Sequence, residues 1–192
     1  MYKVLCLHGS EQSAKIFKAK IGRFPHKCRS SFELKFLDAP NLLNKLEGET
    51  ELKSWYTRDP LNGMINIESL QNSLQFIENE FKMNGNYDGI LGFSMGGSIA
   101  SILAMLPDRY PEIKFIISIG ARDISELLND LNMTDELVYK HIKSLHVMGK
   151  TDQSVPIESS IELMKRFYNP IILEHEKGLN FSSHLYLYKV ST

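Results

Sequence analysis

The sequence is poor in cysteine and has no excess of charge of either sign. Its 192 residues include two cysteines, Cys6 and Cys28, whose number and spacing match neither a disulfide framework nor a zinc motif. Twenty-two Lys and Arg residues against 23 Asp and Glu residues give a net charge of −1. This balance argues against a nucleic-acid-binding protein, which normally has a basic excess. We therefore expect a small-molecule partner, no nucleic acid and no bound metal.

Long apolar runs are also missing. The run at residues 4–7 is too short for the core of a signal peptide, and the most apolar stretch, residues 91–106, is shorter than the ~18 residues that indicate a membrane span. The sequence has no repeat, low-complexity tract or Gly/Pro/Ser-rich linker. These absences predict a cytoplasmic protein with no membrane span, folded as one domain over residues 1–192.

What the sequence does contain is an alternation of short apolar runs with longer helical patterns. The predicted strands are buried on both faces and lie at 4–7, 34–37, 89–92, 115–119, 145–148 and 171–173. Apolar residues at helical spacing predict helices over 67–83 and from 157 to 167, and a buried helix over 97–106. This alternation predicts an α/β fold with a mostly parallel sheet of about six strands and helices on both faces. Ligands then bind at the carboxyl ends of the strands.

The segment Gly92-Phe-Ser94-Met-Gly96 follows the third predicted strand and precedes the buried helix. Gly-x-Ser-x-Gly in a strand–turn–helix context is the nucleophile elbow, in which the turn is so sharp that glycines are needed to avoid clashes. Ser94 is therefore the predicted nucleophile. The alternative is a glycine turn that only packs the helix on the strand.

A serine nucleophile needs backbone N–H groups that hold the oxyanion. In this architecture one N–H belongs to the residue after the nucleophile, here Met95, and the other to a loop after an earlier strand. The first predicted strand ends in Leu-His8-Gly-Ser10, so we assign the second N–H to Ser10, with Glu11 as the alternative. Otherwise His8 is only a packed core histidine beside a tight turn.

The acid of a catalytic triad must follow a later strand, and two carboxylates do. Asp152 follows the strand at 145–148 in a Gly-x-x-Asp turn, and Asp123 follows the strand at 115–119. We assign the acid to Asp152. Asp123 is alternatively the N-cap of a helix over 124–131, with Glu126 completing a capping box.

The chain order of this fold is Ser, Asp, His, so the base should follow the last predicted strand. His175 and His184 are the histidines after Asp152. His175 lies so close to the strand end that it can belong to the sheet, whereas His184 lies in a segment with the composition of a loop. We assign the base to His184.

Taken together, these residues resemble the FSH family of serine hydrolases, an α/β-hydrolase group that includes the ovarian cancer-associated-gene-2-like esterases. The resemblance covers nearly the whole chain and rests on an ordered set of segments, at 4–9, 38–40, 55–56, 87–97 and 145–156. It implies a compact α/β-hydrolase fold without cofactor and a serine carboxylesterase or acyl-thioesterase activity. It also implies alkyl-chain substrates, which the aromatic side chains of Trp55, Tyr56 and Phe93 would accommodate.

The sequence departs from this family near its C-terminal end. The family follows its last strand with His-x-Gly-Gly-His-x-x-Pro, whose second histidine is catalytic, and here Leu179 takes that place. The resemblance further implies that the usual C-terminal helix is lacking. An alternative function is therefore a catalytically impaired relative that binds an acyl ligand or a partner. A nucleotide-binding fold is disfavoured, because no Gly-x-Gly-x-x-Gly follows the first predicted strand.

Overall fold

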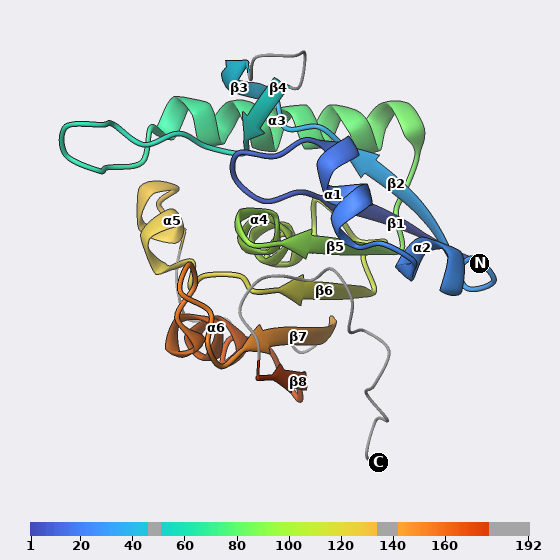
Figure 1. Cartoon of the computed structure of the whole chain (residues 1–192). Coiled ribbons are helices and arrows are strands. Elements are labelled where there is room, and N and C mark those ends of the chain that lie inside the picture. The colour runs from blue at the N-terminus through green and yellow to red at the C-terminus, as the bar shows by residue number, and fades with distance from the viewer. Residues whose placement is uncertain (46–50, 134–141, 177–192) are drawn as a thin grey trace.

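The protein is built on a six-stranded parallel sheet with the strand order β2-β1-β5-β6-β7-β8 (Figure 1). The computed structural model describes residues 1–45, 51–133 and 142–176. The strands of this sheet are β1 (Tyr2–Leu7), β2 (Phe32–Leu37), β5 (Gly89–Phe93), β6 (Phe115–Ile119), β7 (Lys143–Gly149) and β8 (Ile171–His175). The six predicted strands and the parallel sheet are thus confirmed. The prediction that all six are buried on both faces is wrong for β2 and β8, which are partly exposed because they form the two edges of the sheet.

Helices cover both faces of the sheet, as predicted. One face packs against α3 (Ile67–Asn84), α4 (Met95–Ala104), α5 (Ser125–Asp130) and α6 (Ile157–Met164), and the other against α1 (Ala14–Lys20). A short helix, α2 (Phe24–Lys27), follows α1 in front of the sheet in Figure 1. A separate antiparallel pair, β3 (Asn41–Lys45) and β4 (Glu51–Ser54), precedes α3.

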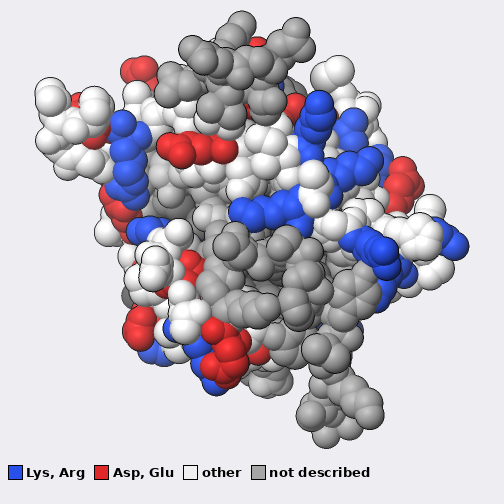
Figure 2. Space-filling view, in the orientation of Figure 1, with Lys and Arg blue, Asp and Glu red and all other residues white. Residues whose placement is uncertain are grey.

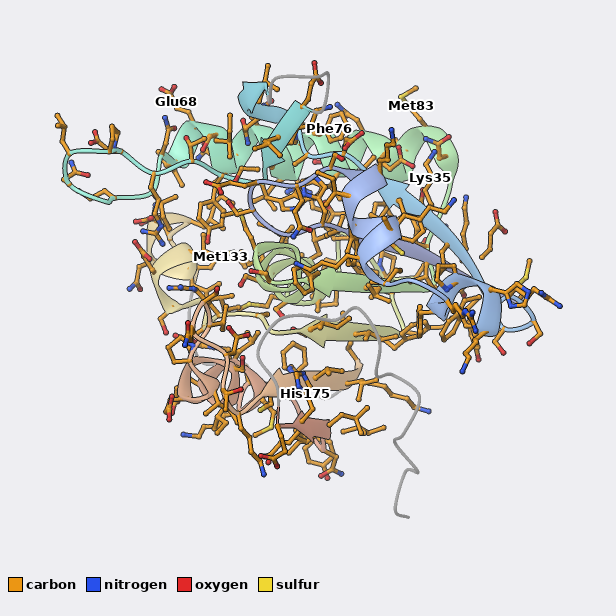
Figure 3. The ribbon with its side chains drawn as sticks, viewed as in Figure 1. Lys35, Glu68, Phe76, Met83, Met133 and His175 are labelled. Atoms are coloured by element: carbon orange, nitrogen blue, oxygen red, sulfur yellow. The ribbon has the colours of Figure 1, made fainter. Side chains whose placement is uncertain are left out.

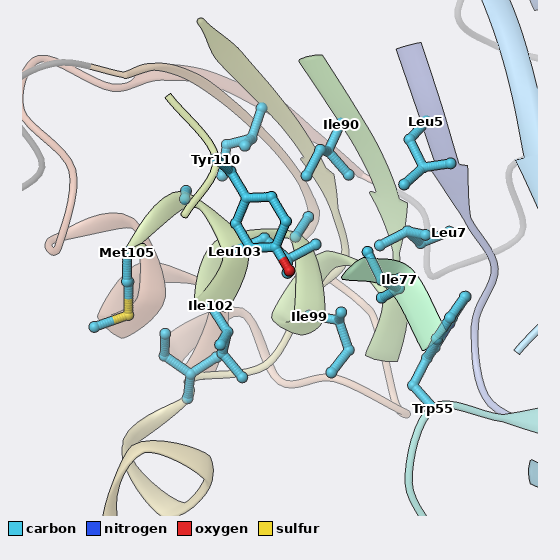
Figure 4. Close-up of a cluster of buried hydrophobic side chains, with 14 of the residues drawn as sticks. Leu5, Leu7, Trp55, Ile77, Ile90, Ile99, Ile102, Leu103, Met105 and Tyr110 are labelled. Carbon is cyan, nitrogen blue, oxygen red and sulfur yellow. The ribbon is translucent and has the colours of Figure 1, made fainter. Parts of the chain in front are cut away.

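Successive side chains of the central strands pack alternately into two separate hydrophobic cores. Leu5 and Leu7 of β1 point into the larger core with α3 and α4, whereas Val4 and Cys6 point into the smaller core with Phe17 of α1. Figure 4 shows part of the larger core, where leucines and isoleucines of β1 and β5 pack with those of α4. Because both faces are buried, apolar side chains occur on both sides of each central strand.

The parallel arrangement brings four chain segments to one edge of the sheet, on the left in Figure 1. At this carboxyl edge Ser94 follows β5 and Asp152 follows β7, with the 120–123 loop after β6 and the His8–Gln12 loop after β1. Residues that are far apart in the sequence therefore meet where an α/β sheet binds its ligands.

The charges are balanced in number but not in place. The stretch from Gln12 to Phe32 contains no Asp or Glu and carries a set of basic residues, Lys15, Lys18, Lys20, Arg23, Lys27 and Arg29. Figure 2 shows lysine and arginine side chains gathered over α1 and α2. We call this set the α1–α2 basic face. Within the described ranges, no helix is long and apolar enough to cross a membrane.

Candidate active site

Ser94 occupies a strained turn between β5 and α4. Its backbone has φ 51° and ψ −119°, a left-handed conformation that costs a residue with a side chain about 1–3 kcal/mol. The turn is held on both sides, because the Ser94 N–H donates to the Ile119 carbonyl at 2.8 Å and the Gly97 N–H donates to the Ser94 carbonyl at 2.9 Å. The side chain is half-buried at the carboxyl edge.

The two glycines that flank Ser94 are required by close backbone contacts. A Cβ atom on Gly92 would lie 2.3 Å from the Gly96 carbonyl oxygen, and one on Gly96 would lie 2.2 Å from the Leu7 carbonyl oxygen. Real Cβ atoms do not approach backbone this closely. The Gly-x-Ser-x-Gly pattern therefore reflects close backbone packing within the turn and between the turn and β1.

The predicted oxyanion donors belong to the start of α4 and to the loop after β1. Met95 is the first residue of α4, whose first N–H groups have no partner within the helix and carry partial positive charge. Ser10 lies in the exposed loop after β1. That loop is anchored, because Gln12 pairs with Lys53 through backbone bonds of 2.9 and 3.4 Å. The two N–H groups remain predicted oxyanion donors.

His8 has the contacts of a packed core histidine. Its Nε2 accepts the Ala39 N–H at 3.0 Å, and its Nδ1 lies 2.7 Å from the Gly9 carbonyl oxygen, so the ring is neutral with its proton on Nδ1. Burial lowers the pKa of this imidazole. The Trp55 indole N–H donates to the His8 carbonyl at 2.8 Å. His8 thus supports the loop that carries Ser10 and has no ring nitrogen left for catalysis.

The three aromatic residues predicted for the substrate pocket are buried. The Trp55 ring packs against that of His8, with ring centroids 5.3 Å apart and the planes tilted by 38°, and Tyr56 follows it directly. Phe93 packs against Phe17, and the Lys20 ammonium lies 4.4 Å from its ring centroid. Phe93 directly precedes Ser94, and the contact of these three rings with a substrate remains a prediction.

The two candidate acids have different partners. Asp152 Oδ1 accepts the N–H groups of Ser154 at 2.8 Å and Val155 at 2.9 Å. Asp123 instead accepts two hydrogen bonds from Arg166, at 2.8 and 3.1 Å, and the hydroxyl of Ser125. Burial alone would raise the pKa of Asp123, but the bonds from Ser125 and Arg166 outweigh it and leave the pKa below its usual value.

These partners separate the roles of the two carboxylates. Asp123 is engaged in a partly buried ion pair, with side chains 25% and 13% exposed for Asp123 and Arg166. The capping box does not form, since α5 begins after Ile124 and Glu126 pairs with Arg58 at 2.6 Å. Asp152 is held by backbone groups and has no cationic hydrogen-bond partner among the described residues. Asp152 remains the predicted acid.

One candidate base can be located. His175, labelled in Figure 3, is the last residue of β8 and is paired in register with Gly149 of β7. It lines a small hollow together with Asp152 and Phe93. His184, the assigned base, and Leu179 lie outside the described residues. In the part of the chain that the structure describes, no group of three His, Cys, Asp or Glu side chains is arranged to hold a metal ion.

The sequence is similar to those of known serine hydrolases and esterases. Residues 1–179 match a family model described as "Serine hydrolase (FSH1)". The chain is 29% identical over 194 residues to "Esterase CG5412" of Drosophila melanogaster, covering 93% of this chain and 68% of that protein. It is 25% identical over 202 residues to "Esterase OVCA2" of Homo sapiens, covering 92% and 87%.

Among solved structures, acyl-protein thioesterase 2 of Zea mays aligns with a TM-score of 0.66 at 17% identity, covering 92% of this chain and 85% of that one. At this identity the likeness concerns the fold. With the six-stranded parallel sheet and its helices, it establishes the α/β-hydrolase architecture.

Proposed function

The chain belongs to the serine hydrolase (FSH1) family, and from this premise we propose that it is an esterase that cleaves acyl esters or thioesters through a covalent acyl-serine. The observation that carries the proposal is the Ser94 turn. A left-handed serine between a buried strand and a helix N-terminus has no packing role that a glycine would not fill with less strain.

In the proposed reaction, the Ser94 hydroxyl attacks the ester carbonyl while a histidine accepts its proton. The negative oxygen of the tetrahedral intermediate accepts hydrogen bonds from the N–H groups of Met95 and Ser10. Collapse of the intermediate expels the alcohol or thiol, which takes the proton from the histidine. Water then attacks the acyl-serine by the same route and releases the acid.

The proposed acid is Asp152 and the proposed base is His184. The acid holds the imidazole in the right tautomer and stabilises its charged form. Two amide N–H groups hold Asp152 in one orientation, which supports this role. His184 is proposed from the chain order of the fold.

The proposed substrates are small acyl esters whose alkyl chain lies against Trp55, Tyr56 and Phe93. Carboxylic and thiol esters share the carbonyl carbon that Ser94 attacks, so kcat/KM for matched oxygen and sulfur esters distinguishes the two activities. We further propose that the protein acts in the cytoplasm, without nucleic acid as a partner.

The nucleophile is tested with a fluorophosphonate probe and a short p-nitrophenyl ester. Ser94→Ala should abolish labelling and lower kcat by at least about 10³-fold, because the acyl acceptor is gone. Ser101→Ala is the matched control. This buried serine lies on α4, the helix that follows Ser94, and donates to the Gly97 carbonyl at 2.9 Å, so labelling should persist. Undiminished hydrolysis by Ser94→Ala would disprove the assignment.

A further inference from the structure

Arg122 lies in the loop after β6 with its backbone fixed from three sides. Ser98 of α4 donates its hydroxyl to the Arg122 carbonyl at 3.0 Å. On either side of Arg122, Ser160 of α6 donates to the Ala121 carbonyl at 2.8 Å and the Asp123 N–H donates to the Ser159 hydroxyl at 3.0 Å. Serines of α4 and α6 therefore fix the position of the Arg122 backbone.

From this position the Arg122 guanidinium donates a hydrogen bond to the carbonyl oxygen of Ser154. The Ser154 carbonyl and the Val155 N–H belong to the same planar peptide unit. That N–H donates to Asp152 Oδ1 at 2.9 Å, and the Ser154 N–H donates to the same oxygen at 2.8 Å. A single peptide thus separates the guanidinium from the carboxylate.

We propose that Arg122 is a positioning residue for the reaction, which fixes the Asp152 turn and strengthens its hold on the carboxylate. This inference rests on the proposed function, in which Asp152 is the acid. A cation on a peptide oxygen polarises the peptide and makes its N–H a better donor, because hydrogen bonds in series reinforce one another. Arg122 acts through Asp152 and touches no reacting atom.

The proposal also explains why two neighbouring residues with opposite charge do not pair. Asp123 binds Arg166 from α6's C-terminal end, whereas Arg122 points to the acid turn. Arg122 thereby connects the β6 loop to the turn before α6, and Asp123 connects it to the residues after α6. The loop fixes the distance between the nucleophile helix and the acid turn.

The first test separates kcat from KM. Arg122→Ala should lower kcat for a p-nitrophenyl ester about 10- to 100-fold, the cost of a small misplacement of a catalytic group, while KM changes less than about twofold. Arg122→Lys keeps a charged donor and should restore most of kcat. Arg23→Ala removes another exposed arginine, at the start of α2, and should leave kcat unchanged. A rise in KM with unchanged kcat would instead make Arg122 a substrate-binding residue and overturn the proposal.

The second test is a double-mutant cycle with Asp152→Asn. If Arg122 acts through the Asp152 charge, Arg122→Ala should lower activity less than about twofold in the Asp152→Asn background, since residues that act as a unit are non-additive. If the double variant instead loses activity by the product of the two single-variant factors, the inference is overturned. If the single variant Asp152→Asn keeps full activity, the proposed acid is wrong. If Asp152→Asn loses activity while Arg122→Ala keeps it, only the inference about Arg122 is overturned.

Discussion

At the scale of single residues, the contacts of each polar side chain decide which of them can do chemistry. His8 uses both ring nitrogens within the fold, and Asp123 is neutralised by Arg166. Ser94 and Asp152 differ from them because, among the described residues, neither forms a hydrogen bond with another side chain. Ser94 lies on a strained turn, and Asp152 is held by backbone N–H groups. The site therefore consists of the polar residues that the fold leaves available.

The base gives the sharpest prediction at this scale. If His184 takes the proton of Ser94, His184→Ala should lower kcat about as far as Ser94→Ala, because a serine hydroxyl is a poor nucleophile at neutral pH without a base. Leu179→His should then add little. If no histidine serves, the parent enzyme should be weakly active and Leu179→His should raise kcat by several orders of magnitude. Steady-state kinetics of the two variants beside the parent distinguish these cases.

A parent with strong activity that survives His184→Ala would contradict both cases. The base would then be His175, which lines the same hollow as Asp152. His175→Ala is the variant that identifies this outcome, and loss of kcat in it alone would move the base to the end of β8.

How much of the site the sequence could predict depends on how local each contact is. Ser94 and its glycines form one motif, and the Asp152 turn is equally short, so both can be recognised as candidates in the sequence. The supporting contacts of Arg122 and His8 cannot be recognised in this way. The bond of Arg122 joins residues 32 apart and that of His8 joins residues 31 apart. In the segment Gly120-Ala-Arg-Asp the sequence pattern points to the carboxylate of Asp123, whereas Arg122 is the residue that reaches the Asp152 turn.

At the scale of elements, the six strands of the main sheet were predictable and the antiparallel pair was not. The central strands are buried on both faces and apolar throughout, which makes them visible in the sequence. The edge strands β2 and β8 are partly exposed but still contain short apolar segments at 34–37 and 171–173. β3 and β4 pair with each other outside the main sheet, and their polar residues gave no signal. The helix α1 was missed because its seven residues, Ala-Lys-Ile-Phe-Lys-Ala-Lys, hold too few apolar positions to show a period, although Ser13 caps it.

The strand β7 carries a buried histidine that should make stability depend on pH. His146 is 2% exposed, its ring lies 5.0 Å from that of Phe167, and its Nε2 has no partner among the described residues. Burial lowers its pKa from 6.5 to about 4. Between these values the unfolded chain binds the proton and the folded protein does not, so stability falls as pH drops from 6.5 to 4, by about 3 kcal/mol in all.

Urea unfolding of the parent and of His146→Leu at pH 7 and pH 4.5 measures this contribution. The variant should lose less stability on acidification than the parent, because leucine has no proton to bind. His26→Leu, at an exposed histidine of α2, should keep the parent's full pH dependence. Equal acid sensitivity in parent and His146→Leu would show that His146 carries none of it.

At the scale of the whole molecule, a net charge near zero hides a charge asymmetry. The α1–α2 basic face carries six cationic side chains with no acid between Gln12 and Phe32, and the acids that balance them lie elsewhere. A sulfonate surface responds to such a local field rather than to net charge. The protein should therefore bind a sulfonate resin at low salt and pH 7.5, above its pI of about 6.6.

The doubly reversed variant Lys15→Glu/Lys18→Glu should elute at markedly lower salt or not bind. Lys35→Glu/Lys143→Glu changes the net charge equally but at exposed positions on β2 and β7, and it should shift elution less. Equal shifts for the two variants would mean that the resin senses net charge, and the basic face would have no separate effect.

The place of β6 between β5 and β7 has a consequence for how this site can change. Neighbouring strands lie about 4.8 Å apart, so the ends that carry Ser94 and Asp152 are set about 10 Å from each other. No serine hydroxyl and carboxylate can touch across that gap, and an imidazole is a bridge of the required length. The sheet therefore keeps the nucleophile and the proposed acid at a constant spacing. The chain segment that supplies the histidine can be exchanged, lengthened or lost without changing that spacing.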